Sequence, residues 1–370
     1  SWPIYISLQK DGILFKMRRT QDLPDKESAT MFFQDCKLAR QAQITGISHS
    51  IKEILPPDLL DLTQLQKEAN IRYGYTASEV YDIAQSLYEK KLISYPRTSS
   101  RYLTEDVFDS LSPIMARLLS WELFPAAKGT GGIDISSLSR HVISAEKANV
   151  HHAIIITGIR PGNLSEKEMQ VYRLVAGRML EVFMAPCRIE TTNVEAVCAA
   201  QHFKAEQTRI IEAGWHDVFM RSDMVPKSGY SVNELPEVKK GDNLNVCGCN
   251  MVHKKQLPVD PFTDAELVEY MELNGLGTVS SRTNIIRTLV NRKYIRYSGK
   301  YIVPTPKGMF TYETIRGKKI ADTSLTADWE KQLAGFESGM ITGQDFLNRI
   351  RTLAKEMTDD IFNTYSTKEE

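Results

Sequence analysis

The sequence lacks the features that would place it in a membrane or around a structural zinc ion. No apolar run approaches the roughly 20 residues that a bilayer-spanning helix needs, so no membrane partner is expected. The five cysteines include no CxxC pair with zinc spacing, which predicts reduced thiols of a cytosolic protein rather than a zinc finger. The formal net charge is zero, because 46 basic and 46 acidic residues cancel. A neutral total still permits a basic groove for nucleic acid, balanced by acidic outer faces.

The order of strand and helix patterns indicates more than one domain in the 370 residues. Alternating apolar and polar residues surround Asp11-Gly12, a strong signal for a β-hairpin. Helical patterns then fill residues 58 to 184, strand patterns return to about 258, and helical patterns follow. We therefore predict a mixed α+β, multidomain protein. Its parts are a discontinuous β-rich domain (1–57 and 185–258), an inserted helical domain (58–184) and a C-terminal helical domain (259–370).

Helix starts are marked by polar residues at capping spacing. A Thr104 cap is predicted for a helix that Pro113 should kink or divide, and Ser280 or Ser281 should cap a helix through Leu289. Two helices and the hairpin YSGKYIVPTPKG then follow one another in the order of a winged helix. A glycine-rich loop is expected at 128–132. Capping boxes are predicted at Thr76 with Glu79, Ser165 with Glu168, and Thr263 with Glu266.

The segment LISYPRTSSRYL, residues 92–103, holds a tyrosine and an arginine at strand spacing. Pro96 disfavours helix for Tyr95, and in an extended segment the side chains of Tyr95 and Arg97 share a face. A phenol is a weak nucleophile near neutral pH, and a fixed cation favours its ionised form. A guanidinium also holds phosphate by two parallel hydrogen bonds. The pair therefore fits attack on a phosphodiester, although a packed aromatic residue would leave the same local pattern. Thr98, Ser99, Ser100 and Arg101 add donors for phosphate.

Five blocks in order resemble the type IA DNA topoisomerases, especially their topoisomerase III branch. The first holds LISYPRTSSRYL and the helical run before it. The others are HHAIIITG from His151, GLGTVSSRTNIIRTLVNRKYI from Gly275, the hairpin GKYIVPTPKG, and TADWEKQL. Together they cover residues 56 to about 335. Departures from the family pattern include Ile156 in place of a proline and Ser99 in place of an aspartate.

The resemblance implies roles for particular residues. Tyr95 would attack a DNA phosphate and form a 5′-phosphotyrosine link, and Arg97 would orient that phosphate. His151, expected on a helix of the same domain, would stand near this site. In the GLGTVSSRTNII block, glycines allow close approach to DNA and the following helix start attracts phosphate. The residues implied to contact DNA are His151, His152, Arg101, Thr278, Ser281 and Arg282.

The resemblance also implies a toprim domain, which carries an acidic cluster for Mg²⁺. No such unit is found in the sequence, and the first residue is Ser1 rather than Met, so we expect a trimmed chain that binds no metal itself. The expected partners are DNA, preferably single-stranded, and the toprim domain of the same full-length protein. The implied location is cytoplasmic and nucleoid-associated.

The implied fold is a toroid in which the β-rich domain forms an arch with hinges near Pro56 and Pro186. The expected function is the cleavage and strand-passage part of a topoisomerase, inactive without toprim. One alternative is a non-catalytic single-stranded DNA-binding fragment in which Tyr95 is structural. A tyrosine recombinase is disfavoured, because its tyrosine lies near the C-terminal end. A protein-interaction scaffold is the remaining alternative, and DNA binding with a salt dependence would exclude it.

Overall fold

A computed structural model describes residues 1–121, 123–125, 133–135, 138–148, 151–219, 227–253, 260–337 and 342–366. The expected loop at 128–132 lies outside these residues. Two compact units are present. The β unit comprises Ser1–Pro57, Phe124–Asp134 and Leu180–Asp260, and the helical unit comprises Asp58–Leu123, Ile135–Met179 and Pro261–Glu370. The mixed α+β class is confirmed, whereas the division into three domains stays a prediction. Within the described residues, no helix is both long and apolar enough to cross a bilayer.

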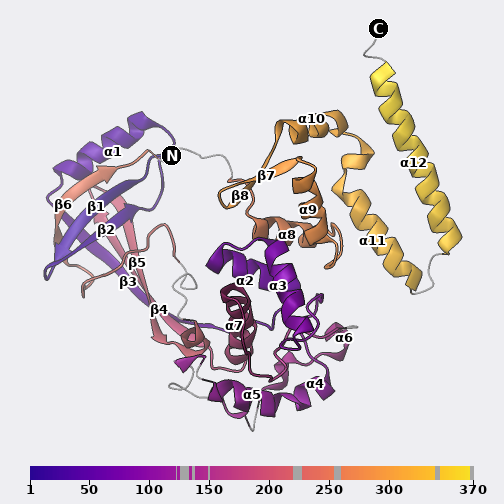
Figure 1. Cartoon of the computed structure of the whole chain (residues 1–370). Helices are drawn as coiled ribbons and strands as arrows, with labels where there is room; N and C mark the ends of the chain where they lie inside the picture. The colour runs from indigo at the N-terminus through magenta and orange to yellow at the C-terminus, as the bar shows by residue number, and fades with distance from the viewer. Residues whose placement is uncertain are drawn as a thin grey trace. The chain divides into compact units, whose positions relative to one another are not determined.

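Six strands of the β unit form a closed barrel in the order β1-β2-β5-β4-β3-β6 (Figure 1). The predicted hairpin around Asp11 and Gly12 is confirmed, with left-handed φ angles of 50° and 81° at its turn. The Asn/Asp-Gly preference of such turns explains why the sequence signal was sufficient. The strands are β1 (Ile4–Lys10), β2 (Ile13–Arg19), β3 (Gln41–Ile54), β4 (Cys187–Cys198), β5 (Gln201–Glu212) and β6 (Asn243–Met251).

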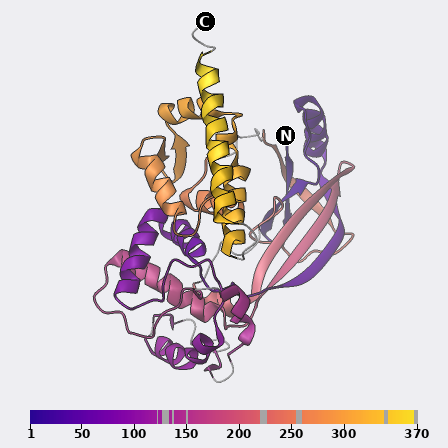
Figure 2. The same ribbon diagram turned by 90° about the vertical axis from the view of Figure 1, so that its right-hand side faces the viewer.

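Alternating apolar side chains fill the barrel core. On β1, Ile4, Ile6 and Leu8 are fully buried, as the period of two requires. Helix α1 (Lys26–Leu38) packs on this core, and Asp25 caps it by accepting a hydrogen bond from the Ser28 amide. Strands β3, β4 and β5 continue as a long antiparallel ribbon (Figure 2).

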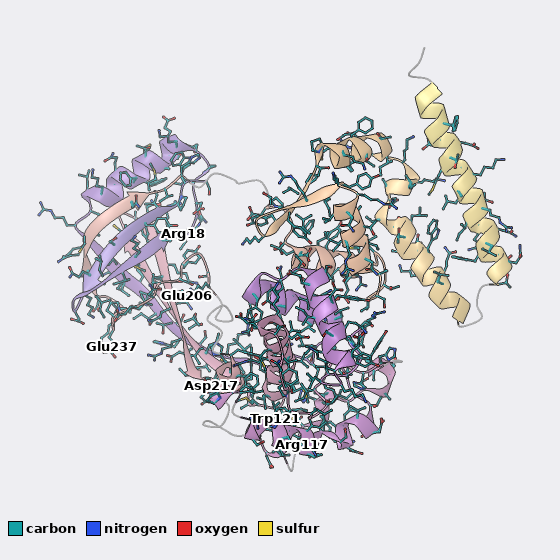
Figure 3. The ribbon with its side chains drawn as sticks, in the orientation of Figure 1. Arg18, Arg117, Trp121, Glu206, Asp217 and Glu237 are labelled. Atoms are coloured by element: carbon teal, nitrogen blue, oxygen red, sulfur yellow. The ribbon has the colours of Figure 1, made fainter. Side chains whose placement is uncertain are left out.

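Side-chain contacts fasten the ends of the ribbon and of the barrel. Trp215 is buried, and its Nε1 donates to the carbonyl of Ile54 at 2.9 Å, at the end of β3. At the barrel, Nη2 of Arg18 (labelled in Figure 3) donates to both carboxylate oxygens of Asp22, and the guanidinium lies over the ring of Tyr230. The hinges proposed near Pro56 and Pro186 stay predictions.

The helical unit follows the predicted helical regions, and its capping boxes at Thr76 and Thr263 are complete. The Ser165–Glu168 box is also present, because each side chain accepts from the other residue's amide. The helices before residue 182 are α2 (Leu62–Tyr73), α3 (Ala77–Glu89), α4 (Glu105–Asp109), α5 (Leu111–Ser120), α6 (Ala145–Ala148) and α7 (Glu166–Glu181), whose last two residues fall in the β unit.

Thr104 is the N-cap residue of α4, as predicted, but its side chain makes no capping hydrogen bond. A hydrogen bond from Thr104 instead contributes to lowering the pKa of the Asp106 carboxyl group. The helix divides at Ser110, which places Pro113 in the first turn of α5. A proline in a first turn costs no hydrogen bond, since those amides lack partners in any helix.

The C-terminal part of the helical unit contains the predicted helix, helix and hairpin, but also a helix that the sequence reasoning missed. Helix α10 begins where PTPKG was assigned to the hairpin, with a Thr305 cap and Pro306 at its first position. Proline there is pre-organised for a helix start. The elements are α8 (Asp264–Leu273), α9 (Arg282–Asn291), β7 (Ile295–Ser298), β8 (Tyr301–Pro304), α10 (Pro306–Ile315), α11 (Thr323–Glu337) and α12 (Gly343–Ser366).

Candidate active site

The segment that carries Tyr95 is fixed by backbone hydrogen bonds to residues 153–157. After α3, Lys91 adopts a left-handed φ of 60° and the chain turns into an extended run. The Ser94 amide donates to the carbonyl of Ile155 at 2.8 Å, and the Thr157 amide donates to the carbonyl of Leu92 at 3.1 Å. These bonds hold the tyrosine segment on a rigid support, which a nucleophile requires.

Two aromatic side chains flank Tyr95. Its half-buried ring lies 4.6 Å from the ring of His151 and meets Tyr88 of α3 edge to face at 5.4 Å, measured between centroids. His151 thus stands beside Tyr95, as the resemblance implied. The expectation that His151 lies on a helix is wrong, because His151 lies in a bend before an extended segment that forms bridges to Leu60 and Ile93. Buried β-branched isoleucines at 154–156 favour this extended form.

Arg97 packs against α3, the helix that Tyr95 also contacts. Its guanidinium lies 5.0 Å above the ring of Tyr81, and Nη2 donates to Gln85 Oε1 at 3.2 Å. Among the described residues, its buried Nε has no hydrogen-bond partner. Tyr81, Gln85 and Tyr88 follow one another at helical spacings of four and three, so they form one stripe of α3. We call these three residues the α3 stripe. It contacts Arg97 at one end and Tyr95 at the other.

The α3 stripe was missed at the level of sequence. Its spacing is visible in TASEVYDIAQSLYEKK, where Tyr81, Gln85 and Tyr88 fall on one helical face. Nothing in that pattern says which segment the face contacts. The expected sharing of a face by Tyr95 and Arg97 agrees with their contacts to one stripe.

The other polar residues of LISYPRTSSRYL have intramolecular partners. Thr98 and Ser100 are buried, and their hydroxyls donate to the carbonyls of His151 and Lys147 at 2.9 and 2.7 Å. These two hydroxyls therefore support the fold rather than offering the free phosphate donors that the sequence suggested. Ser99 remains exposed.

Arg101 forms an ion pair with Asp61, with 2.6 Å between Nε and Oδ2. Burial raises the pKa of Asp61, against the hydrogen bond from the Gln64 amide and the charge of Arg101. Arg101 also lines an open pocket of about 430 Å³ with Ser99 and Lys147. It is thus partly committed to the fold and partly directed to a surface pocket.

His152 has a local partner as well. Its Nδ1 lies 2.7 Å from the carbonyl oxygen of Ala153, which makes that nitrogen the donor. The contact fixes the ring next to the backbone of the extended segment. DNA contact by His152 stays a prediction.

The GLGTVSSRTNII block forms a tight loop before α9. Gly275 and Gly277 both have left-handed φ angles, and a Cβ on Gly277 would lie 2.9 Å from Ser281 Oγ. The amides of Ser281 and Arg282 donate to the carbonyl of Thr278, while the Thr278 amide donates to Ser281 Oγ at 2.8 Å. Ser281, one of the two predicted alternatives, is the N-cap residue of α9, but it makes no side-chain capping bond. The loop closes on itself instead.

Arg282 is directed inward. It is only 8% exposed, its Nε donates to the carbonyl of Leu276 at 3.4 Å, and Nη1 lies 3.5 Å from the Glu272 carboxylate. These contacts stabilise the glycine loop. DNA contact by Thr278, Ser281 and Arg282 stays a prediction, since the structure gives each of them an intramolecular partner.

Within the helical unit, polar contacts fix α3 to the C-terminal elements. The buried carboxylate of Asp264, at the start of α8, accepts from the amide of Ala77 and from the hydroxyl of Tyr297 at 2.9 Å. Arg287 of α9 pairs with Asp82 of α3 at 2.9 Å. The N-terminal half of the helix that carries the α3 stripe is therefore held by residues 187 and 205 positions away.

No group of three or more His, Cys, Asp or Glu side chains in the described part of the chain is placed to hold a metal ion. The site itself consists of a phenol, an imidazole and a guanidinium. These groups fit an anionic phosphate ester better than a cation.

Comparison with known proteins gives the class of the molecule. The fold matches full-length topoisomerase I from Thermotoga maritima with a TM-score of 0.72 and 22% identity, over 96% of this chain and 58% of that chain. A family described as DNA topoisomerase matches residues 1–348. The chain therefore belongs to the type IA DNA topoisomerase family.

Curated relatives point to one branch of that family. DNA topoisomerase 3 of Bacillus licheniformis is 31% identical over 87% of this chain and 47% of its own length. DNA topoisomerase 3 of Bacillus subtilis is 30% identical over 89% of this chain and 48% of its own length. The chain thus spans about half the length of the curated relatives it matches.

Proposed function

We propose that this chain carries the strand-cleaving tyrosine of a type IA DNA topoisomerase. The observation that carries the proposal is the placement of Tyr95 and Arg97 along one stripe of α3, with His151 against the tyrosine ring. Such a site combines a nucleophile with a cation whose Nε is buried and unpaired among the described residues. A phosphate oxygen would supply the missing acceptor.

In the proposed reaction, Tyr95 Oη attacks the phosphorus of a DNA phosphodiester. A P–O bond to tyrosine forms as the bond to the 3′ oxygen breaks, which leaves a 5′-phosphotyrosine link and a free 3′-hydroxyl. The phenol loses one proton and the 3′ oxygen gains one, so nothing is consumed. Arg97 stabilises the charge that develops on the phosphate oxygens. Reversal reseals the strand after another strand has passed, which relaxes or decatenates DNA.

The proposal extends to the partners. We propose that Mg²⁺ acts in the complete enzyme through a toprim domain of the same protein, since the described residues offer no metal-ligand cluster. When bound, the ion would supply positive charge close to the cleaved phosphate. The substrate is DNA, preferentially single-stranded, and the protein is proposed to act at the nucleoid in the cytoplasm.

We also propose a domain division with a mechanical role. Residues 1–57 and 185–258 would form the arch, 58–184 the tyrosine-bearing domain, and 259–370 a DNA-binding domain. Strand passage requires the tyrosine to move away from its partner domain, so bending is assigned to the segments near Pro56 and Pro186.

The test is covalent capture. The chain is incubated with a labelled single-stranded oligonucleotide and Mg²⁺, with and without a separately supplied toprim fragment, and quenched in denaturant. An adduct that needs toprim and disappears in Tyr95→Phe supports the proposal. DNA binding with a normal salt dependence but no adduct in any mixture would instead favour the non-catalytic DNA-binding fragment. Adduct without toprim would refute the requirement for that domain.

A further inference from the structure

Three thiols from separate elements meet in the core of the β unit. Cys36 lies on α1, Cys198 ends β4 and Cys249 lies on β6. Cys36 and Cys198 are fully buried, whereas Cys249 is partly exposed and packs against the same core. All three side chains belong to one packed core cluster, and both of the other thiols act on the pKa of Cys36. All three are free thiols, and the proposed DNA chemistry uses none of them.

A second contact fixes Cys249 beneath the turn of α1 that carries Cys36. Its sulfur lies 3.9 Å from the carbonyl oxygen of Phe33, three residues before Cys36 on the same helix. Residues three apart on a helix share a face. The backbone of β6 is fixed as well, because Cys249 stands opposite Ile6 in the ladder with β1.

The two thiols of this contact differ in reactivity. The hydrogen bond with Cys36 lowers the pKa of Cys249, and the charge of Lys37 contributes in the same direction. The pKa of Cys36 is raised to about 11, because the hydrogen bond to Cys249 and burial outweigh the effect of Cys198. A thiol that is accessible and more acidic is the one that reacts first with an oxidant.

We propose that Cys249 and Cys36 form a peroxide-sensitive pair that closes to a disulfide between β6 and α1. The Cys249 thiolate attacks one oxygen of hydrogen peroxide, the O–O bond breaks, and sulfenic acid and hydroxide result. Cys36 then attacks the sulfenic sulfur, the S–S bond forms, and the displaced hydroxide leaves with the Cys36 proton as water. The two sulfurs lose two electrons in total, and the peroxide gains them.

The chain contains a matched control. Cys247 lies two residues before Cys249 on β6, but its side chain is exposed. Its sulfur contacts Gln9 Oε1 at 3.8 Å rather than another thiol. Peroxide reaches both cysteines, yet only Cys249 has a second thiol beside it.

The test treats the folded protein with hydrogen peroxide, removes the excess with catalase, alkylates free thiols in denaturant and maps peptides without reduction. The expected product contains the Cys36 and Cys249 peptides joined by a disulfide. Its mass is about 2 Da, the mass of two thiol hydrogens, below the summed masses of the two unmodified peptides. A link between Cys36 and Cys198, or oxidation of Cys247 with Cys249 still alkylated, would overturn the proposal. So would five alkylated thiols.

Variants separate the two steps. In Cys36→Ser, Cys249 should stop at sulfenic acid and acquire a dimedone label, whereas Cys247→Ser should form the disulfide as the wild type does. No dimedone label on Cys249 in a folded Cys36→Ser protein would refute the assignment of the attacking thiol. If Cys36→Ser does not fold, the wild-type peptide map still decides the proposal. Cys249→Ser decides it as well, because it should yield no disulfide-linked Cys36 peptide after peroxide.

Discussion

Replacement of Asp61 by alanine should destabilise the protein through two lost contacts. Asp61 is 1% exposed and is the N-cap of α2, where its Oδ1 accepts from the Gln64 amide at 2.7 Å. Its Oδ2 accepts a hydrogen bond from Nε of Arg101 at 2.6 Å. One carboxylate thus fixes both the start of α2 and an arginine of the segment that carries Tyr95.

The magnitude follows from these contacts. Loss of an N-cap costs about 1 kcal/mol. Loss of a hydrogen bond to a charged partner costs about 1.5–3 kcal/mol, and the lower half of that range applies because the Arg101 side chain is 35% exposed and solvent screens it. Asp61→Ala should therefore lower the free energy of unfolding by about 2.5–3.3 kcal/mol. Asp61→Asn keeps the cap and should cost about half as much.

Urea unfolding followed by circular dichroism measures the change, as a lower midpoint at constant slope. Asp58→Ala is the matched control, since Asp58 is an exposed carboxylate three residues away and should change the free energy by less than about 0.5 kcal/mol. If Asp61→Ala were no worse than Asp58→Ala, the cap and the ion pair would not have the assigned roles.

Two further predictions concern the site and its support. Tyr81→Leu removes the ring beneath Arg97. In the presence of the toprim fragment, this variant should form about 2- to 30-fold less covalent DNA adduct. Tyr81→Phe should retain it, and equal losses in both variants would argue against the cation–π contact. Glu168 has its pKa lowered from 4.5 to about 2, chiefly by the hydrogen bond from Lys90. The contribution of the Glu168 carboxylate to the stability of the fold is therefore present above the ordinary carboxylate pKa and is lost as pH falls toward 2. Thermal melts should fall more steeply in acid for the wild type than for Glu168→Gln, and parallel curves would contradict this assignment.

Local signals predicted the parts of the fold that depend on neighbouring residues. The Asp11-Gly12 turn and the Thr76 capping box each need only three or four residues, and both formed as expected. Thr104 and Ser281 both occupy their predicted N-cap positions, but neither makes the side-chain capping bond. Asp106 offers Thr104 a competing acceptor. The glycine loop before Ser281 folds back, and the Ser281 hydroxyl accepts from the Thr278 amide.

The candidate site shows the same limit at longer range. Alternation placed Tyr95 and Arg97 on one face, but the partner of that face depends on how α3 docks. That docking is fixed by Asp264, whose buried carboxylate accepts from the first amide of α3 and whose pKa is raised by its burial. No local pattern connects positions 77 and 264, so only the folded chain reveals the connection.

The position of α3 connects the C-terminal segment to the nucleophile. The N-terminus of α3 is held by Asp264, and its middle and end contact Arg97 and Tyr95. Over 13 residues a helix spans about 20 Å as a rigid rod. In the proposed reaction, a shift of α8 or β7 on binding DNA would move Tyr95 and Arg97 together and preserve their spacing. Attack as proposed would require that spacing, strand passage would require movement, and a single helix behind both residues would meet the two requirements at once.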